Sequence, residues 1–413
     1  MSPPSAAQPP LMAHRPFALF WGARVLATIA YQMQAVAVGW QVYDLTGSAL
    51  ALGLIGLVQF IPAVGLALIV GHIADRYDRR TVLRLCQLTE ASVAAVLAVA
   101  SAGGWLSGGA ILGLVFVIGA ARAFELPTLH ALMPTLVPPA LIPRAAAAST
   151  SANQTAIIVG PALGGLIYAV GPVAVYGLCT VLFLAASTLV ALIGLRRARA
   201  PREPLRLETL LAGFVYVRSR RVIMGAILFD LFAVLFGGAT ALLPIFARDI
   251  LLTGPGGLGL LRSAPAAGAL AISLWLARHP LGSHVGHLLF AAVALFGVAT
   301  IVFGLSTSIV LSLAALAVLG AADALSVVIR FSLVQIETPD GMRGRVSAVN
   351  SMFIGASNTL GEFESGAAAA LLGAVPAVLL GGIATLVVAF LWRRIFPELW
   401  RLERLAPTGA RET

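Results

Sequence analysis

Charged side chains lie inside long apolar stretches of this sequence, and they are its best candidates for chemistry. Arg122 and Glu125 are three residues apart, a spacing that on a helix lets the two side chains pair directly. Each charge at the centre of a bilayer costs about 2.5–3.5 kcal/mol on insertion scales, so these groups are expected to face a partner, water or the protein interior.

A buried carboxylate near an arginine can bind or release a proton as the conformation changes, which couples proton movement to substrate movement. We therefore expect proton coupling at such a pair, and a static structural ion pair is the alternative. The candidates are Arg24, Arg122, Glu125, Asp230, Asp323, Arg330 and Glu362, while Glu90 and Glu364 lie at the same expected depth.

A second pattern, GHIADRYDRR, occupies residues 71–80, in the loop after the second apolar stretch. Asp75 can face a helix N-terminus elsewhere in the chain, while Arg76 and Arg79 can hold nearby carboxylates. Contacts of this kind form in one conformation and break in another, which predicts a gating latch. A generic basic loop beside a membrane is the alternative. The latch candidates are Gly71, Asp75, Arg76, Arg79 and Arg80.

A third pattern, AIIVGPALGG, occupies residues 156–165. Small residues recur every four positions in it, so one helix face is smooth enough for a neighbouring helix to approach closely. The proline removes a backbone donor and favours a bend. The expected packing hinge consists of Gly160, Pro161, Gly164 and Gly165.

The elements that must hold these residues are apolar helices. The 413 residues are 59% hydrophobic and 11% charged, whereas a soluble domain carries about 25% charged residues. A span needs about 20 mostly apolar residues, and this predicts an all-α membrane protein with twelve transmembrane helices. The stretches lie near 17–43, 49–73, 81–102, 106–133, 145–168, 172–195, 222–247, 256–277, 285–305, 309–334, 346–371 and 375–396.

The basic residues set the expected orientation and domain boundaries. The sequence has no lysine, so all of its basic side chains other than histidine are arginines, and they gather in alternate loops. This pattern predicts a protein of the inner membrane with both termini in the cytoplasm. A polar segment splits the stretches into two sets of six; it resembles an amphipathic helix, with a solvated linker as the alternative. The expected divisions are a tail at 1–15, a bundle at 16–195, a linker at 196–221, a bundle at 222–396 and a tail at 397–413.

The two sets of six resemble each other. Gly119–Ala121 matches Gly320–Ala322, and Pro138 matches Pro339, all at one constant offset. Two parallel halves with a binding site between them are the architecture of one large class of secondary transporters. The repeat therefore predicts two pseudo-symmetric six-helix bundles.

These motifs resemble the major facilitator superfamily. Residues 71–80 are similar to its loop signature G-x-L-x-D-R-x-G-R-R, with Ile73 and Asp78 as departures, and residues 156–165 are similar to its exporter and antiporter pattern G-P-x-x-G-G. Arg122 falls where the superfamily places an arginine implicated in proton transfer. The segments 39–46 (GWQVYDLT) and 339–348 (PDGMRGRVSA) look like the enterobactin-exporter-like and drug-efflux branch.

The resemblance implies a secondary transporter that exports an amphipathic small molecule, siderophore or drug-like, by alternating access and proton-coupled antiport. A lipid or lysolipid flippase or an importer on the same fold is the alternative. A membrane enzyme is disfavoured because no clustered nucleophile and base are found, and a sensor is disfavoured because the tails 1–15 and 397–413 are too short for a soluble domain. The expected partners are the lipid bilayer, a small-molecule substrate and protons, with no nucleic acid, and the chain is expected to be a monomer.

No cofactor or metal site is expected. His284 and His287 are three residues apart, but a metal pair would need a third ligand, so side chains that reach the membrane surface are favoured. Cys86 and Cys179 lie in apolar stretches and are interpreted as packing residues. A phosphate-binding glycine loop is absent from the sequence, so the proton gradient is the expected energy source.

Overall fold

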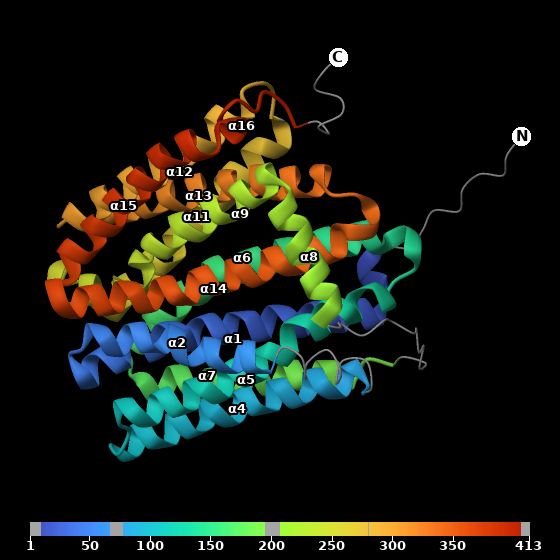
Figure 1. Cartoon of the computed structure of the whole chain (residues 1–413). Coiled ribbons are helices and arrows are strands. Elements are labelled where there is room, and N and C mark those ends of the chain that lie inside the picture. Colours follow the sequence, from blue (N-terminus) through green and yellow to red (C-terminus); the bar gives the residue numbers. More distant parts are fainter. Residues whose placement is uncertain (1–9, 67–76, 195–206, 280, 406–413) are drawn as a thin grey trace, which may run out of the picture.

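Helices make up almost all of this computed structural model, which describes residues 10–66, 77–194, 207–279 and 281–405. Figure 1 shows them as long, roughly antiparallel rods. The longer helices of the first half are α1 (Arg15–Thr46), α2 (Ala49–Gly65), α4 (Arg79–Gly103), α5 (Gly108–Leu132), α6 (Ile142–Tyr168) and α7 (Pro172–Ala191). Those that follow are α8 (Leu207–Ser219), α9 (Arg221–Phe236), α11 (Gly254–Arg278), α12 (Val285–Leu305), α13 (Ile309–Glu337), α14 (Asp340–Leu372) and α15 (Ala374–Ile395).

Short capped turns connect these helices at the end of the molecule away from the arginine-rich loops. The Ser48 and Ser107 hydroxyls accept hydrogen bonds from the first turns of α2 and α5, so each begins where a serine can satisfy a free backbone N–H. Gly47 ends α1 with φ 59°, a left-handed conformation that glycine adopts without a steric cost. Each turn returns the chain immediately into the next helix.

The seventh predicted stretch, 222–247, is not one helix in the structure. Helix α9 ends at Phe236, and the chain continues through η4 (Ala239–Leu242), α10 (Leu243–Ile245) and the π-helical segment η5 (Phe246–Ile250). The break follows Gly237 and Gly238, where α14 packs so closely that a methyl group on Gly238 would collide with its backbone. The absence of side chains at these two positions permits both the close approach and the loss of helical order.

The helices pack as two bundles that meet along a central interface. In Figure 1, α1, α2, α4, α5 and α7 lie together, α9, α11, α12, α13 and α15 lie together, and α6 and α14 run between them. Helix α6 packs against both α1 and α11, and α14 packs against both α2 and α9. Helix α8 lies on α14 and α9, at the segment expected to be the linker.

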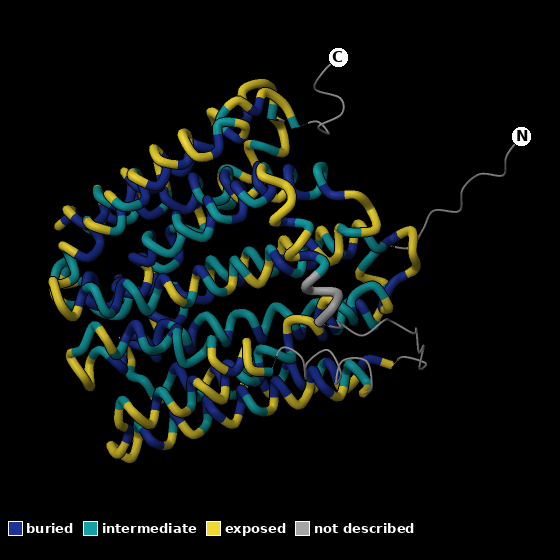
Figure 2. The backbone as a smooth tube through the Cα atoms, viewed as in Figure 1, coloured by how far each residue is buried: buried dark blue, intermediate teal, exposed yellow. Residues whose placement is uncertain are grey.

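The outer surface of the described helices is apolar. Figure 2 shows exposed residues along the outer rods, and they include large apolar side chains such as Val99, Val181 and Phe390. Such a surface is stable in lipid and not in water. Eight described spans are long and apolar enough to cross a membrane, namely Arg79–Gly103, Gly108–Thr135, Pro172–Ala191, Arg221–Ile250, Gly254–Arg278, Val285–Leu305, Ile309–Glu337 and Ala374–Ile395.

Besides the short helix α8, four of the long described helices fall outside that set, and all four lie at the interface between the bundles. They are α1, α2, α6 and α14. Helices α1, α6 and α14 carry more polar residues, while α2 is apolar but has only 17 described residues. Polar side chains therefore concentrate where the bundles face each other, away from lipid.

Candidate functional site

A cavity of about 180 Å³ lies between the two bundles. Helix α1 forms one wall, and α2, α5, α11 and α14 complete it. This volume equals that of roughly six water molecules in the liquid, so the space suits a small solute or part of a larger one. The lining residues are Tyr31, Gln32, Gln34, Ala35, Val38, Ile55, Gln59, Val115, Ile118, Arg262 and Glu362.

The two charged residues of this cavity both come from the second bundle. Arg262 lies on α11 and Glu362 on α14, whereas the facing wall carries the amides and the phenol of the first bundle. Glu362 was a proton-coupling candidate from the sequence. Arg262 was missed, although its position inside the apolar stretch 256–277 is the same signal that identified the other charges.

A buried cluster of charges adjoins the cavity inside the first bundle. The Arg122 Nη1 atom donates a hydrogen bond to Glu125 Oε2 at 3.2 Å and lies 3.7 Å from Glu90 Oε1 on α4. The guanidinium of Arg122 also lies over the ring of Tyr31, 3.7 Å from its centroid. Arg122 is thus held between a cavity-lining aromatic ring and two carboxylates.

One of these carboxylates is poorly satisfied. Glu90 is 0% exposed, and neither of its side-chain oxygens accepts a hydrogen bond within the described residues. The ion pair of Arg122 with Glu125 agrees with the helical spacing of the two residues. The sequence placed Glu90 at membrane depth but did not identify it as the second carboxylate of this cluster.

Arg24 does not pair with a carboxylate among the described residues. Its Nη1 atom donates a hydrogen bond to Ser149 Oγ on α6 at 2.7 Å. Arg24 instead holds α1 to α6 within the first bundle.

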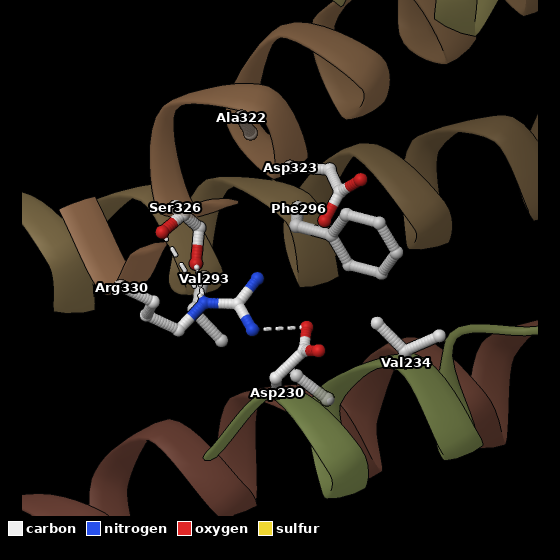
Figure 3. A pocket seen from close by; sticks show the side chains of 9 residues that line it. Asp230, Val234, Val293, Phe296, Ala322, Asp323, Ser326 and Arg330 are labelled. Carbon is white, nitrogen blue, oxygen red and sulfur yellow. Dashed lines mark hydrogen bonds and ion pairs between the residues drawn. The ribbon is translucent and has the colours of Figure 1, made fainter. Parts of the chain in front are cut away.

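A second buried ion pair lies inside the second bundle, where Figure 3 shows it from close by. Arg330 on α13 pairs with Asp230 on α9, and its Nε atom donates to the Ser326 hydroxyl at 3.0 Å. Asp323, one turn before Ser326, lines the same small cavity of about 10 Å³. The structure therefore groups three of the sequence candidates and encloses them with Phe296 from α12.

Polar contacts join the bundles at the end opposite the arginine-rich loops. The Tyr43 hydroxyl on α1 donates to Asp249 Oδ2 at 2.5 Å, and Arg248 Nη1 lies 3.0 Å from Asp44 Oδ1. Both partners from the second bundle belong to η5, directly after the break in the seventh stretch. These four residues are called the Tyr43–Asp249 gate below.

The small residues of the third motif pack against both bundles. Gly160 and Gly164 face α1, next to Gln32 and Met33. Gly165 faces α11, where a methyl group built on it would lie 2.9 Å from the Cα atom of Gly259. Because no side chain larger than hydrogen fits there, α6 and α11 approach backbone to backbone. Pro161 lies within the continuous α6 beside this contact.

At the arginine-rich end, the described side-chain contacts of Arg79 and Arg80 lie within the first bundle. Arg79 donates to the Ala131 carbonyl at 3.0 Å, and Arg80 donates to the Ile193 carbonyl at 2.7 Å while pairing with Asp78. All described ion pairs that join the bundles are at the Tyr43–Asp249 gate. The latch candidates Gly71, Asp75 and Arg76 lie outside the described residues.

The remaining candidates form no metal or thiol site in the described part. His287 stacks on Trp400 with 4.2 Å between ring centroids, and His284 lies 5.8 Å from His287. No group of three possible metal ligands occurs among the described residues. Cys86 and Cys179 are buried and unbridged.

A family model described as transmembrane secretion effector matches residues 5–407. The chain belongs to this family of the major facilitator superfamily. It is also similar to the enterobactin exporter EntS of Escherichia coli O139:H28, with 25% identity over 415 residues, covering 96% of this chain and 95% of the relative. The enterobactin exporter EntS of Citrobacter koseri is 26% identical with the same coverage.

Solved structures show the same fold. A bacterial homologue of the lysosomal transporter Spinster, inward-facing and unoccupied, has a TM-score of 0.74 at 13% identity, covering 95% of this chain and 99% of that one. A bacterial homologue of the iron transporter ferroportin, inward-facing, has a TM-score of 0.69 at 16% identity, with coverages of 95% and 99%. This chain is therefore a twelve-helix transporter of the inner membrane and not an enzyme.

Proposed function

We propose that this member of the transmembrane secretion effector family exports an amphipathic small molecule by alternating access, in antiport with protons. The observation that carries the proposal is a cavity between two bundles that the Tyr43–Asp249 gate joins at one end. In this state the cavity is closed off at the Tyr43–Asp249 gate. Export requires that gate to separate and the arginine-rich end to close.

The latch predicted from residues 71–80 supplies the opposite closure in this proposal. Arg79 and Arg80 are anchored on carbonyls of their own bundle, which fixes the base of the loop that carries Asp75 and Arg76. Asp75 then faces the other bundle only when the arginine-rich end closes. In this proposal both termini lie in the cytoplasm. The halves 16–195 and 222–396 move as two units of a monomer.

In this proposal the buried carboxylates bind the transported protons. Glu90 and Glu125 share one guanidinium, so a proton can supply the positive charge that Arg122 cannot give to both. Asp323 lies near Arg330, which already pairs with Asp230, and a shift of Arg330 between these two carboxylates changes which of them binds a proton. Each arrangement couples a proton to a conformation.

The proposed cargo class is taken from the enterobactin exporters that this chain resembles. A siderophore or drug-like molecule has apolar and polar parts, and the cavity offers both, with Val38, Ile55 and Val115 beside its amides. The curated relatives are named as exporters of enterobactin. Iron-free enterobactin is therefore the first cargo to test.

The test uses everted membrane vesicles that contain the full chain and have an acidic lumen. We expect enterobactin to accumulate in them and to leave when a protonophore collapses the pH gradient. Vesicles without the chain provide the background. Accumulation that persists unchanged without the gradient would remove proton coupling, and a lack of accumulation would remove enterobactin as cargo.

A further inference from the structure

Two opposite charges in the central cavity attract each other without forming a direct ion pair. Arg262 and Glu362 form no ion pair or hydrogen bond with any described residue, yet both line the same space of about 180 Å³. A charge removed from bulk water without a partner is unfavourable by several kcal/mol, so a cavity that closes around both must provide each with a counter-charge. Neither the Arg122 cluster nor the Arg330–Asp230 pair supplies one, because their described contacts lie elsewhere.

Each of these two side chains reaches across the interface to a glycine of the other bundle. The Nη2 atom of Arg262 would lie 3.1 Å from a methyl group built on Gly39 of α1, and the carboxylate of Glu362 would collide with one built on Gly56 of α2. The first bundle therefore leaves room for both charged groups. When the bundles separate, Arg262 and Glu362 withdraw from these positions and their surroundings change.

The wall opposite the two charges offers neutral hydrogen-bonding groups. Gln34 is 2% exposed, and its Nε2 atom has no hydrogen-bond partner within the described part of the chain. The amide of Gln32 lines the same wall, and Gln59 accepts a hydrogen bond from Tyr31. An unpartnered buried amide that lines a cavity indicates that a ligand completes its hydrogen bonding.

We propose that the cavity binds a zwitterionic solute. Arg262 holds the anionic group of the solute, Glu362 holds its cationic group, and Gln34 Nε2 donates a hydrogen bond to a neutral acceptor on it. The inference rests on the proposed exporter function and names a substrate class other than enterobactin, which has no cationic group for Glu362. A neutral solute leaves both charges unpaired, and a singly charged solute leaves one. Only a solute that carries both signs gives Arg262 and Glu362 each a direct counter-charge when the cavity closes.

Three small probes of one carbon skeleton separate these cases. L-phenylalanine is zwitterionic at neutral pH, phenethylamine is a cation and 3-phenylpropionate is an anion, and all three are close to the cavity in size. Equilibrium binding of each radiolabelled probe is measured on the purified full chain in lipid nanodiscs, without a proton gradient. We expect the zwitterion to bind roughly tenfold more tightly than either singly charged probe, as one additional ion pair provides.

Charge-neutral variants then assign the two ends of the solute. Arg262→Gln is expected to weaken binding of L-phenylalanine and 3-phenylpropionate roughly tenfold and to leave phenethylamine unchanged. Glu362→Gln is expected to weaken L-phenylalanine and phenethylamine and to leave 3-phenylpropionate unchanged. The matched controls are Arg278→Gln, an exposed position on the same helix as Arg262, and Glu364→Gln, which lies two residues from Glu362 and does not line the cavity.

The ranking of probes on the unmodified chain decides the inference even if a variant fails to fold. Equal or tighter binding of a singly charged probe, or no binding of any of the three, overturns it and indicates that Arg262 and Glu362 neutralise each other on closure. Because binding is measured without a gradient, this result is independent of proton-driven export. Failure of accumulation in vesicles removes the export proposal and leaves a zwitterion site standing.

Discussion

Arg330 and Arg122, two of the arginines at membrane depth, are held in different ways, and variants of the two clusters should fail differently. Arg330 has one carboxylate in direct contact and a serine hydroxyl that fixes its Nε atom. Arg122 is shared between two carboxylates and an aromatic ring. In this state Arg330 is held on one carboxylate, whereas Arg122 already lies between two.

For the Arg330–Asp230 pair we predict a loss of stability that a second substitution partly restores. Arg330→Ala leaves Asp230 buried and unpaired, which costs about 3–5 kcal/mol. Adding Asp230→Asn removes that charge, so the double variant should be more stable than the single one. Thermal unfolding followed by size-exclusion fluorescence measures both, and equal melting temperatures for the two variants would contradict a direct ion pair.

For Glu90 we predict a loss of coupling without a loss of folding. Glu90→Gln leaves Arg122 with one carboxylate, so no proton is needed to balance the cluster. Coupling free energies of about 1–3 kcal/mol correspond to changes in affinity of roughly 5- to 150-fold. The stimulation of uptake by the pH gradient should therefore decrease by a factor in that range. Gln87→Met, one turn away on the same buried face of α4, is the control and should transport normally. A full response in the Glu90 variant would exclude this group from coupling.

At the scale of elements, the contact of α6 with α11 depends on the absence of side chains. A methyl group on Gly165 would lie 2.9 Å from the Cα atom of Gly259, so the two helices must separate to admit it. Gly165→Ala should therefore reduce transport several-fold. Gly177→Ala on α7 is the matched control, because its methyl group meets nothing within 4 Å and alanine favours a helix by up to about 1 kcal/mol. Transport is the readout, with expression and melting temperature as checks on folding, and equal activity of the two variants would contradict close packing as the function of the motif.

Sequence alone predicted most of these elements because length and hydropathy decide where a chain crosses a membrane. The stretches 285–305 and 172–195 correspond closely to α12 and α7. The break in the stretch 222–247 was not predicted, because it arises from packing of α14 against Gly238 and that contact is remote in sequence.

The candidate site was predicted less completely, for a physical reason. Spacing along one helix predicts a pair such as Arg122 with Glu125, since both side chains share a face. The partnership of Arg122 with Glu90 depends on how α4 packs against α5, and the ring of Tyr31 reaches the same guanidinium from α1. No single-helix pattern contains that information.

For the whole molecule, alternating access predicts that a fixed gate stops transport. Asp44→Cys with Arg248→Cys joins the bundles where a 3.0 Å ion pair now links them, in a background of Cys86→Ala and Cys179→Ala. A short thiol cross-linker should abolish uptake, and a cleavable form of it should restore uptake on reduction. Each single cysteine variant with the same reagent is the control. Undiminished uptake after cross-linking would mean that this end need not open.

The uneven distribution of polar residues among the helices also bears on how the protein is made. Helices α1, α6 and α14 fall short of the apolar character that carries a segment into a bilayer unaided, and they lie at the interface between the bundles, where α1 and α14 also line the cavity. Helix α14 brings Glu362 and Glu364 with it. Such a segment becomes stable in the membrane only beside neighbours that shield its polar face, so biogenesis must retain it at the insertion machinery until those neighbours have arrived. Two of the groups proposed to receive the solute, Gln34 on α1 and Glu362 on α14, thus also make the newly synthesised chain dependent on cooperative insertion.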